Sequence, residues 1–352
     1  MSTAAPTARP ATLRSPGRAR PPRRHAAGWV VGALAVLLGA VALSVLVGAN
    51  PVPPGDVLDA LLGRGTDTAR FVVWDQRLPR TLAGLVVGGA LGVAGALMQA
   101  FTRNPLADPG LLGVNAGAAF AVALGITFLG VTTPAGYMWL ACLGALVVAV
   151  GVHVLGGAAD LRASPARLVV TGVAVGAVLA GLTSGLTLTH PDTFDRMRGW
   201  AAGSLLERGP QVVLPVLPLV VLGLLVAALT ARSLNAVALG PDVAQAQGVD
   251  VRRTRVLVLA AVTVLAGGAT AIAGPVAFVG LMVPHVVRWT LGTDQRRVLA
   301  GSLLGGCVLV VASDVVGRVA VPPGEMPVGV VTAFVGAPVM IALARRRRAT
   351  AL

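Results

Sequence analysis

The chain has 352 residues, of which 55% are hydrophobic and only 12% are charged, and its mean hydropathy is +0.82. A soluble domain of this length lacks the polar residues to cover such a core, so the composition excludes that class and indicates a membrane protein. The net charge of +14 comes from arginines between apolar runs, where bilayer proteins carry their orientation charges, so no nucleic acid partner is expected.

The first 25 residues hold six arginines, five prolines and no acidic residue, a composition with no apolar surface to bury. We therefore predict a disordered basic tail over 1–25. The uncharged run 26–49 follows, and its 24 residues exceed the roughly 20 that cross a hydrocarbon core. Because the run is too long for the core of a signal peptide, it is predicted to be the first membrane-spanning helix.

Nine further spans follow from the same criterion. The 51 residues of 109–159 carry no formal charge and are predicted to form two helices that turn at 131–137. The run 256–287 would extend about 48 Å as one helix, beyond a hydrocarbon core of about 30 Å, so it is predicted to break at the Ala-Gly-Pro of 273–275. The remaining single spans are 81–102, 168–190, 210–231, 298–317 and 327–344. The prediction is an all-α integral membrane protein of about ten transmembrane helices.

Glycine spacing predicts how these helices pack. Gly84, Gly88 and Gly92 recur at every fourth residue, and Gly301 and Gly305 repeat the interval. Such spacing allows another helix to approach closely and predicts packing seams. The alternative, that these small residues line a wide conduit, stays open at this point.

The arginine distribution predicts the orientation. If the N-terminus is cytoplasmic, 20 of the 28 arginines lie inside the cell, including those of the tail 346–352 and the helix end before it. An even number of spans places both arginine-rich termini on the same side, as the positive-inside rule requires. We therefore predict a multi-pass protein of the cell membrane with both termini cytoplasmic and a transmembrane domain over 26–345.

The residue types also limit the chemistry. The phosphate-binding loop of an ATPase needs a lysine, and this chain has none, so ATP hydrolysis would come from a separate subunit. No nucleophile–base pair and no metal-ligand cluster is visible, so neither an enzyme nor a cofactor is predicted. Ionisable groups are nearly absent from the predicted bilayer centre, where ion-coupled carriers need them. Any molecule that crosses the membrane through this protein is therefore expected to be large or to bring its own metal ligands.

One polar stretch, 232–255, interrupts the apolar chain. Within it Gly240 can act as an N-cap, Pro241 suits the first helical position, Asp242 complements the helix dipole and Gly248 offers a left-handed stop. These signals predict a two-turn helix over 241–247. A helix this short is marginal alone in water, so it should be ordered by packing on something.

The apolar residues of this short helix indicate what it contacts. Val243, Ala244 and Ala246 form too small a face for strong binding to a membrane surface. A groove on a partner protein needs only a few such anchors. We therefore favour a protein partner over a helix that lies along the bilayer.

Four long motifs carry a resemblance to a known family. They are RLPRTLAGLVVGGALGVAGALMQAFTRNPLADPGLLGVNAGA (77–118), LNAVALGPDVAQAQGV (234–249), GPVAFVGLMVPHVVRWTLGTDQRR (274–297) and PGEMPVGVVTAFVGAPVMIAL (323–343). They resemble the permeases of ABC importers for iron–siderophores, haem and vitamin B12, the BtuC-like permeases. The resemblance covers about 29–345.

The resemblance implies a dimer, either a homodimer or a pair with a similar permease, with ten helices per subunit and a translocation path at the dimer axis. Cytoplasmic ABC ATPase subunits would bind below and an extracytoplasmic substrate-binding protein above. The implied function is ATP-driven import of a metal chelate, first an iron(III)–siderophore complex, with haem or cobalamin as alternatives. An ATP-independent secondary carrier is the alternative from another class.

The resemblance also implies site residues. The segment that matches the family's ATPase-coupling helices comprises Leu239, Gly240, Pro241, Asp242, Val243, Ala244, Gln245, Gln247 and Gly248. Arg77, Arg80 and Arg318 match basic residues that pair with carboxylates of the binding protein, and we expect them in exposed, individually weak ion pairs at the outer face.

The inner gate region of the family matches Ser164, Pro165 and Ala166. Pro165 and Ala166 stand where a relative carries small hydroxyl residues, so the chemistry of this gate departs from the family pattern. Asn115 departs as well, at a position that is often Gly or Ser.

Overall fold

The computed structural model describes residues 23–157 and 165–345, and these residues form an all-helical bundle without a strand. The first half contains α1 (Arg23–Leu46), α2 (Pro54–Leu61), α3 (Asp67–Phe71), η1 (Val72–Arg77), α4 (Leu78–Thr102), η2 (Pro109–Leu112), α5 (Val114–Leu129) and α6 (Pro134–Leu155). The second half contains α7 (Pro165–Thr189), α8 (Pro191–Ala201), α9 (Pro210–Ala238), α10 (Pro241–Ala246), α11 (Val251–Ala273), α12 (Val279–Leu291), α13 (Gln295–Val319) and α14 (Val328–Arg345).

Seven helices of the described residues are long and apolar enough to cross a membrane. They are 28–46, 67–102, 134–155, 166–189, 210–238, 251–273 and 295–319, and two shorter apolar helices cover Val114–Leu129 and Val328–Ala342. The prediction of an all-α membrane protein is therefore confirmed. Of the predicted tail 1–25, residues 1–22 lie outside the described residues, and Arg23 already belongs to α1.

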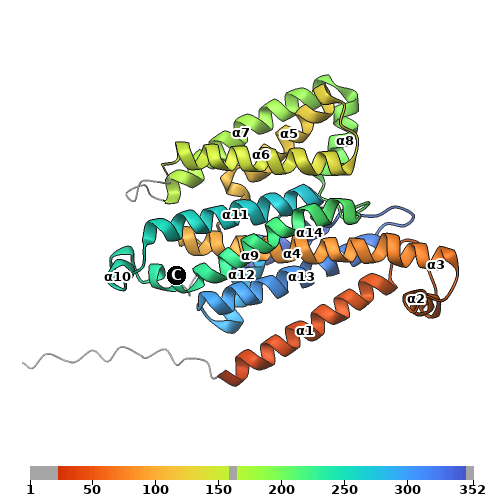
Figure 1. Ribbon diagram of the computed structural model, residues 1–352, viewed down its shortest axis with the longest axis horizontal. Coiled ribbons are helices and arrows are strands. Elements are labelled where there is room, and N and C mark those ends of the chain that lie inside the picture. The colour runs from red at the N-terminus through yellow and green to blue at the C-terminus, as the bar shows by residue number, and fades with distance from the viewer. Residues whose placement is uncertain (1–22, 158–164, 346–352) are drawn as a thin grey trace, which may run out of the picture.

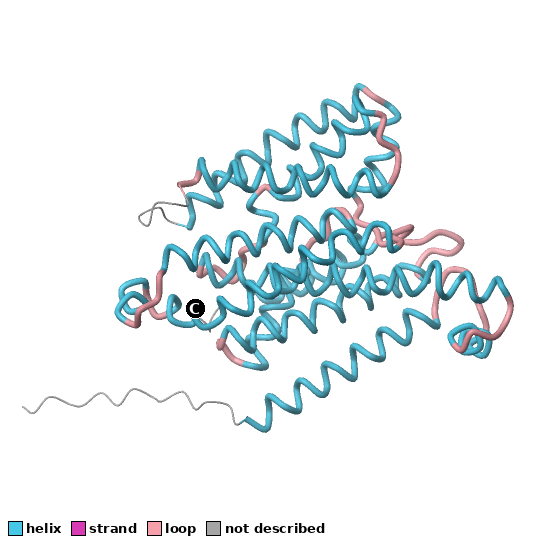
Figure 2. The backbone as a smooth tube through the Cα atoms, viewed as in Figure 1, coloured by secondary structure: helices cyan, strands magenta, loops and turns pink. Residues whose placement is uncertain are grey.

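The bundle has two distinct ends. The long helices run side by side and most connecting loops lie at their ends (Figure 2). The short helix α10 marks one end, where α1 also begins, and α2 and α3 lie at the other (Figure 1). Helices α5 to α8 form a layer along one side of α11, and α1 lies along the opposite side of the molecule (Figure 1).

Helix α4 is the buried centre of the bundle, and it starts earlier than its hydropathy indicates. The helical path is continuous from Asp67 through α3 and η1 into α4, whereas the apolar run begins at Thr81. Its packing on α13 follows the predicted glycine seam, because a Cβ at Gly88 would lie 2.3 Å from the carbonyl oxygen of Gly306. Backbone approach this close accepts only glycine on both helices.

The partner glycines of this seam differ from the predicted ones. Gly306 and Ser302 of α13 face α4, while Gly301 and Gly305 face valines of α12. The predicted break after Ala273 is confirmed, because α11 ends there and α12 begins at Val279.

Candidate functional site

The α10 end of the bundle carries the short helix that the sequence predicted. Gly240 has φ of +121° before Pro241, and Gly248 has φ of +78° after the helix, both in the region that favours glycine. Asp242 lies in the first turn, as the dipole argument required. The helix over 241–246 therefore confirms the predicted local structure to within one residue.

The side chains of α10 point in two directions. Ala244 is fully buried in a small apolar cluster with Ala236 and Val251, which corrects the prediction that it belongs to a partner-facing surface. Its inward direction follows from the contact of α10 with both α9 and α11. Val243 and Leu239 point outward, with 43% and 66% of their surface exposed. These are the large apolar side chains exposed in the segment 239–248, where Pro241 and Ala246 are exposed as well.

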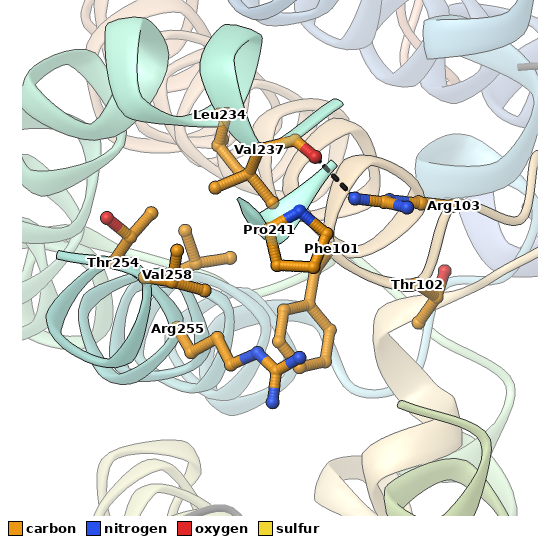
Figure 3. Close-up of a pocket in the computed structure, with 10 residues that line it drawn as sticks. Phe101, Thr102, Arg103, Leu234, Val237, Pro241, Thr254, Arg255 and Val258 are labelled. Atoms are coloured by element: carbon orange, nitrogen blue, oxygen red, sulfur yellow. Dashed lines mark hydrogen bonds between the residues drawn. The ribbon is translucent and has the colours of Figure 1, made fainter. Parts of the chain in front are cut away.

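A cavity of about 210 Å³ lies behind α10. Figure 3 shows side chains from α4, α9, α10 and α11 around it. It is lined by Phe101, Thr102, Arg103, Leu234, Val237, Pro241, Val251, Thr254, Arg255 and Val258. The guanidinium of Arg103, just after α4, donates a hydrogen bond to the carbonyl oxygen of Val237 near the end of α9 (Figure 3). The central helix and the segment that leads into α10 are thus joined at this point.

The opposite end carries a buried network of charges, which we call the arginine cluster: Arg77, Arg80, Asp314, Arg318 and Glu325. Arg80 donates hydrogen bonds to Asp314, with Nε 3.0 Å from both carboxylate oxygens and Nη2 2.8 Å from Oδ1. Its Nη1 lies 2.6 Å from Oε2 of Glu325. The other oxygen of Asp314 accepts from Nη2 of Arg318 at 2.6 Å. One carboxylate therefore joins two guanidiniums.

The remaining donors of the arginine cluster hold the end of α1. Arg77 donates to the carbonyl oxygens of Val45, Leu46 and Asn50 at 2.7 to 2.9 Å. Arg318 donates from Nη1 to the carbonyl oxygen of Ser44 at 2.6 Å. The last carbonyls of a helix lack partners within it and carry partial negative charge, so cations there are stabilising.

This burial corrects the expectation of exposed surface pairs. Only 4% of Arg77 and 2% of Arg318 are exposed, and Arg80 is mostly covered as well. A cavity of about 50 Å³ opens beside them, lined by Gly48, Ala49, Asn50, Val72, Gln76, Arg77, Arg80, Arg318 and Glu325. Sequence reasoning missed Asp314 and Glu325, although an acid inside the apolar run 298–317 was a signal of an internal partner.

A third feature is an apolar cavity of about 710 Å³ beside α14. Asn115 lines it, and its Oδ1 accepts from the hydroxyl of Thr270 at 2.8 Å. The other lining residues are Ala201, Ala202, Pro275, Ala277, Gly329, Val330, Ala333, Phe334, Ala337, Pro338 and Ile341. Of the predicted gate, Ser164 lies outside the described residues, Pro165 begins α7 and Ala166 is exposed.

Comparison with known proteins decides the family. Residues 36–346 match the model of the FecCD transport family. The chain belongs to the FecCD transport family. Among similar permeases, the ferric enterobactin permease FepD of Escherichia coli is 50% identical over 90% of this chain and 95% of its own. The cobalamin permease BtuC of Halobacterium salinarum is 38% identical over 81% of this chain and 76% of its own.

A solved structure shares the fold of this FecCD permease. It is a metal-chelate type ABC transporter in an inward-facing conformation, with a TM-score of 0.80 and 24% identity, covering 91% of this chain and 99% of the other. The FecCD permease is thus a membrane subunit of the ABC importer type, and its relatives are transport proteins rather than enzymes.

Proposed function

We propose that this FecCD permease carries iron(III)–siderophore complexes in an ATP-driven importer. The 50% identity to the ferric enterobactin permease supports this cargo most strongly, because the ferric dicitrate, haemin and cobalamin permeases share 38%, 37% and 38%. Haem and cobalamin are the alternative cargoes within the family. A carrier that works without ATP finds no support among these relatives.

The permease forms a dimer of ten-helix subunits, as a homodimer or with a similar permease. The count of ten adds the shorter helices α5, α12 and α14 to the seven long spans. Helices α7 and α14 leave large apolar side chains exposed, including Val170, Leu188 and Phe334. We assign these faces to the second permease subunit, and the 710 Å³ cavity beside α14 to a translocation path at the dimer axis.

The α10 end is cytoplasmic in this proposal, and the permease is a multi-pass protein of the cell membrane with both termini inside. The excess of arginines near α10, α11 and the two termini supports this orientation. The ATPase subunit then receives α10 in a groove, with Leu239 and Val243 as the exposed anchors. Pro241, Asp242 and the glutamines Gln245 and Gln247 complete the coupling surface.

The arginine end faces the extracytoplasmic binding protein. The arginine cluster holds three guanidiniums and two carboxylates, so it carries one net positive charge, and all of its members except Asp314 line a small cavity. A carboxylate of the binding protein would find a complementary charge there. We assign the inner gate to Ser164, Pro165 and Ala166, of which Pro165 and Ala166 begin α7.

The test is uptake into vesicles that contain the permease, its ATPase and its binding protein. Ferric enterobactin, haemin, cobalamin and unchelated ferric ion are offered with and without internal ATP. We expect saturable, ATP-dependent uptake of the ferric chelate. Saturable uptake of unchelated iron, or uptake of any cargo without ATP, would contradict the proposal.

A further inference from the structure

A lateral groove of about 590 Å³ runs between α9 and α13, with α4 as its floor. Val93 of α4 lies at the bottom, and the walls are formed by leucines and alanines of the other two helices. Ala228, Leu229 and Ala300 are exposed, so the groove opens to the surroundings of the bundle. The remaining lining residues are Leu224, Ala227, Ala231, Leu299 and Leu303, with Arg232 and Arg296.

The two arginines lie together at one mouth of the groove. Arg232 lies on α9 and Arg296 in the first turn of α13, and the apolar lining extends from them to Leu224 and Leu303. At 1.5 Å per helical residue the apolar trough is about 10 to 12 Å long. Its polar and apolar parts are therefore separated along the helix axes.

At this mouth a hydrogen bond fixes the spacing of α9 and α13, and the two arginine side chains are free to bind a ligand. Oδ1 of Asn235 accepts from the backbone N–H of Gln295 at 2.9 Å, so α9 and α13 are tied next to the arginines. The nearby carboxylate of Asp294 caps α13 by accepting from the backbone N–H groups of residues 296 and 297. Within the described residues, the side chains of Arg232 and Arg296 make no hydrogen bond or ion pair, and both are exposed.

The depth of the mouth matches the level of lipid phosphates. Arg232 lies 22 residues after Pro210, which begins α9, a helical distance of about 33 Å against a hydrocarbon core of about 30 Å. Arg296 is equally separated from Arg318, which belongs to the arginine cluster at the opposite end. Both guanidiniums thus lie where their helices leave the hydrocarbon, and the trough runs from them into the membrane.

We propose that this groove binds an anionic phospholipid, with Arg232 and Arg296 holding the phosphate and one acyl chain in the trough. A phosphate accepts charge-assisted hydrogen bonds from guanidiniums, and basic pockets between membrane helices favour anionic headgroups. A neutral apolar segment of another protein would fill the trough, but it would leave the guanidiniums of Arg232 and Arg296 without an opposite charge.

The test uses the purified permease–ATPase complex in detergent, titrated with phosphatidylglycerol or phosphatidylcholine and followed by native mass spectrometry. We expect one tightly bound phosphatidylglycerol per permease chain and weaker binding of phosphatidylcholine. Because each basic residue near an anionic lipid contributes about a fivefold gain in affinity, Arg232→Gln with Arg296→Gln should weaken phosphatidylglycerol binding by roughly 25-fold.

Two further variants separate this site from general surface charge. Arg252→Gln with Arg253→Gln removes two exposed arginines from the same end of the bundle that do not line the groove, and should leave the affinity within twofold. Ala300→Trp fills the trough without changing a charge and should weaken phosphatidylglycerol binding. Equal affinity for the two lipids would overturn the proposal. So would an unchanged affinity in the groove variants, or equal loss in the Arg252/Arg253 control.

Discussion

The two ends of this permease are built in opposite ways. At the α10 end, a six-residue helix rests on one buried alanine, Ala244, with a cavity of about 210 Å³ behind it. At the arginine end, four charged side chains bond to each other, namely Arg80, Asp314, Arg318 and Glu325. Arg77 and Arg318 donate to carbonyl oxygens at the end of α1. The first arrangement allows a short helix to move with a partner. The second holds three helices, α1, α4 and α13, in one fixed geometry.

The two ends should therefore respond differently when a partner protein binds or a residue is changed. A helix with little packing of its own gains most of its order from a protein bound to it. A buried ionic network instead resists displacement, because separating its members leaves uncompensated charge. We therefore expect changes at the α10 end to alter coupling without unfolding the protein, and changes at the arginine end to alter stability first.

The largest expected effect comes from Asp314→Asn, which removes the carboxylate shared by Arg80 and Arg318. Two mostly buried guanidiniums would lose their common partner, and breaking such a pair costs about 3 to 5 kcal/mol. We expect a marked fall in the thermal unfolding temperature of the purified permease and in its membrane yield. A variant that unfolds at the wild-type temperature would show that the cluster does not fix this end.

Val243→Asp tests the α10 end. Because Val243 is 43% exposed, the isolated permease should fold and insert normally. In a partner groove the new carboxylate would be buried without a partner, at a cost of about 1 to 3 kcal/mol or more. Co-purified ATPase and ATP-driven uptake should therefore fall. Thr293→Asp, with the same charge on an exposed polar residue just before α13 and outside the coupling segment, is the matched control. Normal uptake by Val243→Asp would exclude α10 as the coupling element.

The seam between α4 and α13 joins the two ends, and Gly88→Ala tests its rigidity. The added Cβ would lie 2.3 Å from the carbonyl oxygen of Gly306, so the helices must separate. Overpacking of this kind costs about 1 to 3 kcal/mol, measured as a shift in thermal unfolding. Gly39→Ala on α1, where nothing lies within 4 Å of the new methyl group, should leave stability unchanged or slightly higher. Equal shifts in the two variants would contradict a specific seam.

The features that were predicted correctly are determined by residues that are adjacent in the chain. The start of α10 after Gly240 and the break after Ala273 follow from local backbone preferences, which tertiary packing did not override. The early start of the α4 path was missed because Asp75, Arg77 and Arg80 interrupt the hydropathy but not the helix. Hydropathy indicates which residues of a helix can lie in the membrane, and it does not show where the helix begins or ends.

The features that it predicted poorly depend on distant pairing. Arg80 and its partner Asp314 are 234 residues apart, and no spacing rule joins them. The same holds for the register of the glycine seam, where Gly306 rather than Gly305 meets α4. The inward direction of Ala244 was also hidden, because a two-turn helix has no long periodicity that defines its buried face.

The smallest expected effect on stability, and the sharpest test of docking, is Glu325→Gln. Glu325 binds Nη1 of Arg80 through one oxygen, and the amide oxygen of glutamine can still accept that hydrogen bond, so the expected loss is about 1 kcal/mol. The variant raises the net charge of the arginine cluster from one to two. If a carboxylate of the binding protein docks there, its association with the reconstituted transporter should become about two- to fivefold tighter at low salt, and the gain should vanish at high salt.

Glu207→Gln supplies the matched control, because Glu207 is an exposed acid shortly before α9, at the same end of the bundle, and lies outside the arginine cluster. It changes the net charge of that end by the same amount. A salt-dependent gain in Glu325→Gln alone would locate the docking carboxylate at Arg80. Equal gains in both variants would indicate long-range attraction only. Unchanged binding in Glu325→Gln would leave the arginine cluster with the structural role of holding α1, α4 and α13 together, and would remove it from the docking surface.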